Sequence, residues 1–443
     1  MRPDPFAPLR TFRAALYACF TRRAAALFDL IDALLTVEAI PSPVHLSATP
    51  LHRRCWGSFY AALAKGRIDV AALRTVVAQH PLPDQLPVYA IDVSIWPRCD
   101  AETSPARGFY YHPSRHSAGQ PIVAGWAYQW VAQLGFARDS WTAPLDVQRV
   151  HPSDDSHAVA AGQIHALVRR VPPERNRPLF VFDAGYDPEK LAREMGDLPV
   201  DLLVRLRAGR CFYGDPPPPK STGRPPRHGP KFACDDPATW PQPTVTHTVQ
   251  DDQYGRVVVQ AWAGLHAKSQ NHPARGTRRT RPILRGTLIR VEVTRLPGRM
   301  QKPKVLWLWW HSPTPPDLDL VWRVYVRRCD LEHTFRFLKQ SLLWTVLRPR
   351  TPEQADRWTW VLLAAYTQLR LARPLVADLR LPWERPLSST QLTPVRVRRG
   401  FCHLLPVLGT PAHAPKPCGR SPGRPKGRRS TPAPRCPAIK KAA

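Results

Sequence analysis

Acidic residues are scarce in this chain of 443 residues. It has 34 Asp and Glu against 64 Lys and Arg, which gives a formal net charge of +30. The basic residues are spread along the chain rather than gathered in one tail, so we expect a polyanionic partner, with nucleic acid as the first candidate. A basic structural or ribosome-associated protein would share this charge, so composition alone leaves that class open.

Paired cysteines and long apolar runs are also missing. The nine cysteines include no C-x-x-C pair, so neither a zinc site nor a disulfide framework is supported. No run approaches the roughly 18 apolar residues of a membrane helix, and the N-terminus lacks the uninterrupted apolar segment of a signal peptide. We therefore expect a cytoplasmic protein that has no membrane partner.

Changes in sequence pattern divide the chain into four predicted regions. They are a helical, possibly DNA-binding region at 1–84, a core at 85–210 and 320–375, a β-rich insertion at 211–319, and a basic, Pro-rich region at 376–443. From about Pro411 the last region has nine basic residues, eight prolines and no acid. Such a segment cannot bury enough apolar surface to fold alone, so we expect a disordered arm.

The N-terminal region carries helical periodicity. Apolar residues recur at helical spacing over 9–35, and two shorter helices are predicted near 55–64 and 69–79, on either side of Lys65-Gly66-Arg67. The inner face of the first segment is predicted to hold Phe12, Leu16, Phe20, Leu27, Ile31 and Leu34. Two helices joined by a short Gly turn can read DNA, although an ordinary helical hairpin is more common.

The centre of the chain reads as strands followed by alternating helices and strands. This order predicts an α/β fold with a mixed sheet and helices on its faces. Strands are expected at 88–94, 108–112, 121–134, 179–183, 201–206, 244–264, 286–296 and 304–310, helices at 157–171, 187–196 and 353–372, and a surface loop at 211–240.

Four polar residues have an unusual spacing before the last long helix. Tyr325, Arg328, Glu332 and Lys339 stand at relative positions 0, 3, 7 and 14. On one helix, at about 100° per residue, they would share a strip roughly 60° wide. An apolar stripe is predicted beside them, made of Val324, Leu331, Phe335, Leu338 and Leu342. One carboxylate flanked by cations suits a metal ion held next to a phosphate.

Three acids are candidates for a shared metal site. Asp92 lies within an apolar strand, Asp183 closes the most apolar strand, and Glu332 lies on the helix just described. Three acids brought together by a fold can hold Mg²⁺, and two such ions can drive phosphodiester chemistry. Each acid also has an ordinary interpretation: Asp92 as a satisfied core acid, Asp183 as a helix cap, and Glu332 as an i,i+4 ion-pair partner.

These residues resemble one family. Y-x₂-R-x₃-E-x₆-K over 325–339 matches the signature of a large group of bacterial insertion-sequence transposases of the DDE type. The strand A-I-D-V-S around Asp92 and the segment V-F-D-A-G-Y around Asp183 extend the resemblance over roughly 85–375. It implies a ribonuclease-H-like core with Asp92, Asp183 and Glu332 as the catalytic, metal-binding triad. Mg²⁺ would be the cofactor, with Mn²⁺ as a substitute.

The resemblance also implies how DNA is held. The Tyr, Arg and Lys of the signature, here Tyr325, Arg328 and Lys339, would contact phosphates of the transposon end. Some relatives stack a flipped base on a tryptophan of the insertion. Trp309 is the candidate here, beside Trp307 and Trp310, although core packing is the more common role for a residue of such a strand.

The expected function is DNA transposition. The resemblance also implies a bacterial protein that is nucleoid-associated when it is bound to DNA. The protein would bind terminal inverted repeats as a homodimer, cleave phosphodiester bonds and transfer the freed 3′ ends into target DNA. Two alternatives stay open: a metal-dependent nuclease without strand transfer, and a DNA-binding derivative of a transposase without activity.

Overall fold

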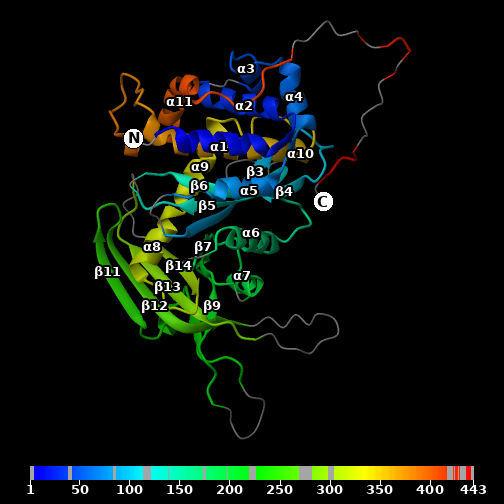
Figure 1. Ribbon diagram of the computed structural model, residues 1–443. Helices are drawn as coiled ribbons and strands as arrows, with labels where there is room; N and C mark the ends of the chain where they lie inside the picture. The colour runs from blue at the N-terminus through cyan, green and yellow to red at the C-terminus, as the bar shows by residue number, and fades with distance from the viewer. Residues whose placement is uncertain are drawn as a thin grey trace. The chain divides into compact units, whose positions relative to one another are not determined.

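The computed structural model describes 4–37, 42–82, 86–112, 121–137, 139–172, 176–196, 198–218, 226–268, 282–297, 304–416, 423, 425–427, 429 and 436–440 (Figure 1). The chain forms two compact units. The first comprises Met1–Pro83, Val93–Asp154 and Asp330–Ala443, and the second comprises Asp84–Asp92 and Asp155–Cys329. Each unit is therefore built from segments that are far apart in the sequence.

Helices dominate the first unit. They are α1 (Ala7–Ala18), α2 (Ala24–Thr36), α3 (Pro43–Ser47), α4 (Trp56–Lys65), α5 (Val70–Ala78), α9 (Cys329–Gln340), α10 (Pro352–Ala372) and α11 (Pro394–Leu408), with short 3-10 turns at Arg373–Leu375 and Ser389–Gln391. Helix α10 is buried on nearly all sides and packs against α1, α2, α4 and α11. A helix that is apolar all round belongs in a core, which is the place of α10 in this unit.

A buried ion pair ties the first helices to α10. Arg13 of α1 donates to Asp32 of α2 at 2.7 Å and to the Gln368 side chain of α10 at 2.7 Å. Burial raises the pKa of Asp32, while the Arg13 guanidinium opposes that shift. Because an unpaired buried charge is costly, these three side chains fix how the helices pack.

The strands of the first unit surround β5. They are β1 (Phe20–Arg22), β2 (Arg67–Ile68), β4 (Gly108–Tyr111), β5 (Ile122–Leu134), β6 (Thr142–Val150) and the second half of β3 (Val88–Pro97). Strand β5 pairs with β4, β6 and β3, and all but one of its residues are buried. Aromatic rings fill its surroundings: Trp96, Trp126, Tyr128, Trp130 and Trp344 pack at ring distances of 5.1–6.2 Å.

The second unit is a sheet with helices. Its elements are the first half of β3, α6 (Ser156–Arg170), β7 (Leu179–Phe182), α7 (Pro188–Met195), β8 (Asp201–Leu206), β9 (Cys211–Tyr213), β10 (Lys231–Ala233), β11 (Val245–Asp251), β12 (Gly255–Ala267), β13 (Gly286–Val293), β14 (Lys304–His311) and α8 (Leu318–Arg327), with a 3-10 turn at Pro237–Thr239. The strand order is β10-β9-β12-β13-β14-β8-β7-β3, and β11 pairs with β12 (Figure 1).

The sheet of this unit is mixed. Strands β3, β7 and β8 run parallel, as expected for strands joined through helices, while β14 joins β8 antiparallel. The β-rich segment that we expected as a separate insertion thus pairs directly with the core strand β8. The prediction of a mixed α/β fold with flanking helices is confirmed.

Most predicted elements are present, but two segments differ. The helix expected over 9–35 is two helices separated by β1, because Phe20–Arg22 pairs with Arg67–Ile68. The predicted inner face is nevertheless buried at all six positions. The surface loop expected at 211–240 contains β9 and β10, and the part at 219–225 lies outside the described residues.

The C-terminal arm lies largely outside the described residues. One described position, Ile439, donates its backbone N–H to the Glu102 carbonyl at 2.9 Å and accepts from Arg107 at 2.6 Å. At this residue the chain is held against the first unit rather than extended freely. Among the described residues, no helix is both long and apolar enough to cross a membrane.

Candidate active site

One predicted acid, Asp92, lies on β3, and the other, Asp183, directly follows the neighbouring parallel strand β7. In the β3–β7 pair Val88 faces Leu179 and Ala90 faces Val181, a constant offset of 91 residues. Extended by two residues, this offset aligns Asp92 with Asp183. Adjacent strands are about 4.8 Å apart, and side chains at one level of a parallel pair point to the same face. The register therefore brings these two carboxylates together at the carboxyl end of β7.

The pKa of Tyr186 reflects both its burial and the charge of this acid pair. Burial raises the pKa of its phenol well above the usual value, and the negative charges of Asp92 and Asp183 raise it further. The phenol therefore stays protonated at neutral pH, and its ring packs on Phe182 at a centroid distance of 4.9 Å. Tyr186 was not predicted as a site residue from the sequence, although it lies only three residues after Asp183.

A guanidinium lies against the first acid. Arg328 Nη1 donates to Asp92 Oδ2 at 2.8 Å, and both side chains are largely buried. Ionised acids that are removed from water require a compensating positive charge. The ion pair supplies that charge, and it shows that this corner of the second unit accepts a cation beside Asp92.

Asp183 is oriented by the turn that follows β7. Its Oδ1 accepts from the Gly185 N–H at 3.0 Å, while its Oδ2 accepts no hydrogen bond among the described residues. A Cβ at position 185 would lie 3.0 Å from Asp183 Oδ1, so glycine allows the backbone to approach the carboxylate closely. One oxygen is thereby fixed and the other is left for a ligand. Asp183 does not cap α7, since Asp187 fills that role by accepting from the Lys190 N–H at 3.0 Å.

His157 is hydrogen-bonded to the segment that follows β7. The Asp187 N–H donates to His157 Nε2 at 2.8 Å, so the ring proton lies on Nδ1, which is 3.0 Å from Asp155 Oδ1. The imidazole meets the Tyr186 ring edge-on at 5.4 Å. Burial raises the pKa of Asp155, but its bonds with Lys190 and His157 outweigh this and lower the pKa to about 2. Asp155 also caps α6, where its Oδ1 accepts from the His157 N–H at 3.0 Å. The network around His157 was not predicted from the sequence.

The four signature residues do not lie on one helix. Helix α8 ends at Arg327, Arg328 forms a turn, and α9 begins at Cys329. The expectation of one continuous helix is therefore corrected at Arg328, although the backbone of this residue is itself helical. The shared strip over 325–339 stays a prediction. Glu332 and Lys339 still share a face of α9 because they are two turns apart. The predicted apolar stripe is buried at all five positions.

The outer members of the signature are partly engaged in packing. Tyr325 on α8 is only 9% exposed. Lys339 Nζ lies 5.7 Å from the ring centroid of Trp344. Glu332 and Lys339 belong to the first unit, whereas Asp92, Asp183 and Arg328 belong to the second.

The residues present fit a divalent cation in part. Within the described ranges no group of three or more His, Cys, Asp or Glu side chains is arranged to hold a metal ion. The second unit supplies two carboxylates at one level, one of them already neutralised by a guanidinium. Oxygen ligands of this kind suit Mg²⁺, which keeps several of its waters.

Trp309 is a core residue. It is 1% exposed, and its ring stacks on Phe212 at 4.9 Å and 13°. The backbone of Gly286 also lies against this ring, because a Cβ at that position would come within 2.4 Å of it. Trp307 and Trp310 are buried as well. The prediction that Trp309 stacks on a flipped base is therefore wrong, because no ring face is available.

Comparison with known proteins identifies the family. A family model described as DDE superfamily endonuclease matches residues 15–268, more than half of the chain. The chain therefore belongs to this family. The matched range contains Asp92 and Asp183 and ends before Arg328 and Glu332.

A solved structure is also similar in outline. It is described as a cryo-EM structure of the piggyBac transposase synaptic complex with hairpin DNA, and it shares 10% sequence identity at a TM-score of 0.38 over 93% of this chain and 76% of that chain. No curated protein matches the chain.

Proposed function

We propose that this protein is a DNA transposase. It would bind transposon terminal inverted repeats, cleave phosphodiester bonds and transfer the freed 3′ ends into target DNA. The observation that carries the proposal is the pair of acids Asp92, on β3, and Asp183, directly after the parallel neighbour β7, whose charges both act on Tyr186 in a DDE superfamily endonuclease. Acids fixed by strands keep the rigid placement that metal-assisted chemistry requires.

Asp92, Asp183 and Glu332 are the proposed ligands of Mg²⁺, with Mn²⁺ as a substitute. When bound, the metal would activate the attacking oxygen and stabilise the leaving oxygen of a phosphodiester. Asp92 and Asp183 would supply negative charge from the second unit. Asp183 Oδ2, which accepts no hydrogen bond from the described residues, is the proposed ligand atom of that side chain. Glu332, from the first turn of α9, would complete the set.

Arg328 has two proposed roles. It neutralises Asp92 in the absence of a cation, through the 2.8 Å ion pair. A bound cation would take over that charge, and the Arg328 guanidinium would then be available to hold a DNA phosphate in bidentate geometry. Lys339 and Tyr325 are proposed as further phosphate contacts, and Tyr325 is not a nucleophile. A homodimer on DNA would hold both transposon ends.

Cleavage assays test the enzymatic part of the proposal. The substrate is a linear DNA fragment that carries the gene with its genomic flanks, incubated with the full chain and Mg²⁺. We expect Asp92→Asn, Asp183→Asn and Glu332→Gln each to reduce cleavage by roughly 100-fold or more, the scale of losing one electrostatic stabiliser. The matched control is Glu194→Gln, which removes one exposed carboxylate from α7 and should cleave like wild type.

The products separate the candidate functions. Integration of the fragment into a supercoiled acceptor plasmid supports transposition, whereas breaks without integration support a nuclease. If wild type cleaves no better than Glu332→Gln while both bind the fragment equally, the protein is not an enzyme of this kind. Equal DNA binding by all variants shows that a loss of cleavage is not a loss of folding.

A further inference from the structure

A cluster of cations forms where β1 meets β2 in the first unit. The sequence Thr21-Arg22-Arg23 lies beside Lys65-Gly66-Arg67, and Arg22 is the direct register partner of Arg67. The side chains of Arg22, Arg23, Lys65 and Arg67 are exposed. We call these four residues the ladder cations.

The ladder cations lack acidic partners. Among the described residues, none of the four has a carboxylate within salt-bridge distance, although the unit contains many Arg–Asp pairs elsewhere. Like charges directly opposite each other on paired strands are destabilising. Arg23 also has a left-handed backbone, with φ of 55°. A bound anion would relieve the charge repulsion between Arg22 and Arg67.

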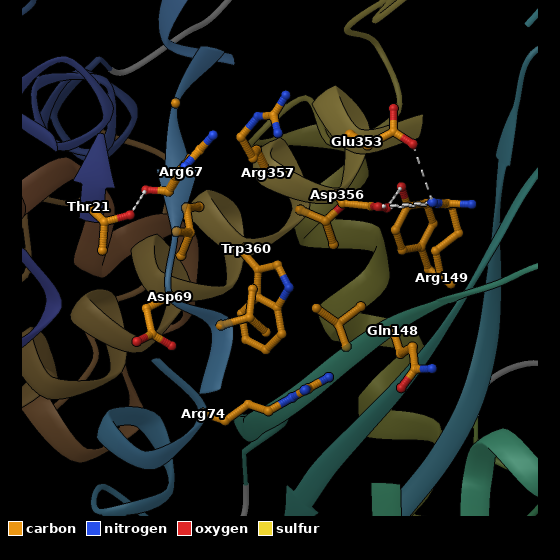
Figure 2. A pocket seen from close by; sticks show the side chains of 16 residues that line it. Thr21, Arg67, Asp69, Arg74, Gln148, Arg149, Glu353, Asp356, Arg357 and Trp360 are labelled. Atoms are coloured by element: carbon orange, nitrogen blue, oxygen red, sulfur yellow. Dashed lines mark hydrogen bonds and ion pairs between the residues drawn. The ribbon is translucent and has the colours of Figure 1, made fainter. Parts of the chain in front are cut away.

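A cavity opens beside this cluster. It has a volume of about 650 Å³ and is entirely within the first unit, between β2, α5, β6 and α10. This volume lies in the usual range for small-ligand sites. Figure 2 shows the indole of Trp360 in the middle of the lining, with Arg67 and Arg357 on one side of it and Arg74 on the other.

The arginines of the cavity fall into two groups. Arg74 donates to Asp146 at 2.6 Å, and Arg149 donates to Asp356 at 3.0 Å, so both charges are compensated. Arg67 has no such partner within the described chain.

Arg357 resembles Arg67 in this respect. Its guanidinium donates to the backbone carbonyls of Leu63 and Ala64, and its Nη1 makes no hydrogen bond among the described residues. Burial lowers the pKa of Arg357, only partly offset by the charges of Glu353 and Asp356. Positive charge available to a ligand is thus concentrated at the Arg67–Arg357 end.

The rest of the lining suits a base. Ile68, Val70 and Trp360 form an apolar wall, and the exposed Gln148 offers an amide with both a donor and an acceptor. Trp56 and Tyr60 lie on α4, the helix that ends at Lys65, and are 67% and 40% exposed, with ring centroids 6.2 Å apart. Exposed aromatic rings combined with basic side chains are typical of single-stranded nucleic-acid sites.

We propose that the cavity and the ladder cations bind one nucleotide unit of a DNA strand, with its phosphate between Arg67 and Arg357 and its base in the cavity. The neighbouring phosphates of the strand lie along Arg22, Arg23 and Lys65. The choice of DNA over a free nucleotide rests on the proposed function. The site itself rests on the unpaired cations and the cavity beside them.

Binding without cleavage tests the site. The full chain in EDTA is titrated by fluorescence anisotropy with a labelled dT 20-mer and with a fully abasic 20-mer of equal charge. We expect the dT strand to bind at least about 5-fold more tightly, because base stacking contributes on that scale. Arg67→Gln should weaken both strands and lower the slope of log K against log salt by about one. Gln148→Trp, which fills the cavity from an exposed position, should remove the preference for bases.

The matched control is Arg348→Gln, which removes an equal charge from a side chain that is 78% exposed and outside the cavity. It should leave affinity and salt slope unchanged. Equal binding of the dT and abasic strands, or an effect of Arg67→Gln no larger than that of Arg348→Gln, overturns the site.

Competition with free dTMP distinguishes the source of the nucleotide. If Arg67→Gln abolishes competition and also weakens the dT strand, the ligand is a DNA strand. If it abolishes only dTMP binding, the site belongs to a free nucleotide and the strand proposal fails. Since EDTA removes the cation needed for cleavage, a failure of the catalytic proposal leaves these outcomes unchanged.

Discussion

At the scale of single residues, charge compensation decides what each acid can do. Asp92 is neutralised by Arg328, and Asp155 is held by Lys190 and His157. Asp183 keeps one oxygen that accepts no hydrogen bond from the described residues. Their surroundings make Asp92 and Asp183 candidates for cation binding and Asp155 a support for the turn behind them.

The ionised state of Asp155 should contribute to stability in a defined pH window. Its pKa is lowered to about 2 in the folded protein, below the roughly 3.9 of an unfolded chain. The contribution is therefore complete above pH ~4 and is lost as the pH falls towards 2. Asp155→Asn keeps a side chain that can cap α6 but removes the charge.

We expect wild type to exceed Asp155→Asn in unfolding free energy by under about 1 kcal/mol near neutral pH, since the site is open to solvent. Denaturant titrations at several pH values should show this difference shrinking below pH ~4. A difference that grows on acidification would contradict the assignment.

At the scale of helices and strands, close backbone contacts and breaks between helices determine where the candidate site residues lie. The turn at Arg328 separates α8 from α9, so Tyr325 lies on one helix and Glu332 and Lys339 lie on the next. In the first unit, Gly125 of β5 lies so close to β3 that a Cβ would come within 2.1 Å of the Trp96 carbonyl oxygen. That contact positions the second half of β3, which follows Asp92 in the chain.

Gly125→Ala should therefore destabilise the protein. Overpacking of this kind costs about 1–3 kcal/mol, because the β3 and β5 backbones must separate. Thermal unfolding followed by circular dichroism measures the change. The matched control is Gly162→Ala in α6, where a Cβ meets nothing within 4 Å and should stabilise by up to about 1 kcal/mol. Equal melting temperatures for the two variants would show that β5 does not approach β3 as described.

At the scale of the whole molecule, the net charge of +30 governs association. Positive side chains that neutralise phosphates release counterions, so DNA affinity falls as salt rises. Positive charge is present in both units, at the ladder cations of the first and at Arg328 of the second.

We expect binding of a duplex 30-mer to weaken by roughly 10³-fold or more between 50 and 200 mM salt, the loss seen for six or more phosphate contacts. Anisotropy titrations at several salt concentrations measure the slope. A nearly flat slope would mean that the excess charge does not contact DNA, which would favour the structural role that composition leaves open.

Much of this protein follows from local sequence pattern. Periodicity alone predicted the strands that carry Asp92 and Asp183, the helices α4 to α7 and α10, and the buried faces of the N-terminal segment. These features depend on hydrophobic burial and capping within a few residues, which a single chain segment already specifies. The resemblance to DDE transposases likewise pointed to the family that the chain belongs to.

Long-range pairing decided the rest. Strand β1 interrupts the first predicted helix because Phe20 finds a partner 48 residues away at Ile68. Trp309 became a core residue because Phe212 and Gly286 close over it.

The acid pair itself has both origins. Sequence identified Asp92 as an acid within one apolar strand and Asp183 as the acid that closes another, but only the β3–β7 register aligns them. No periodicity within either strand could fix that alignment, since it depends on which strands become neighbours and at what offset.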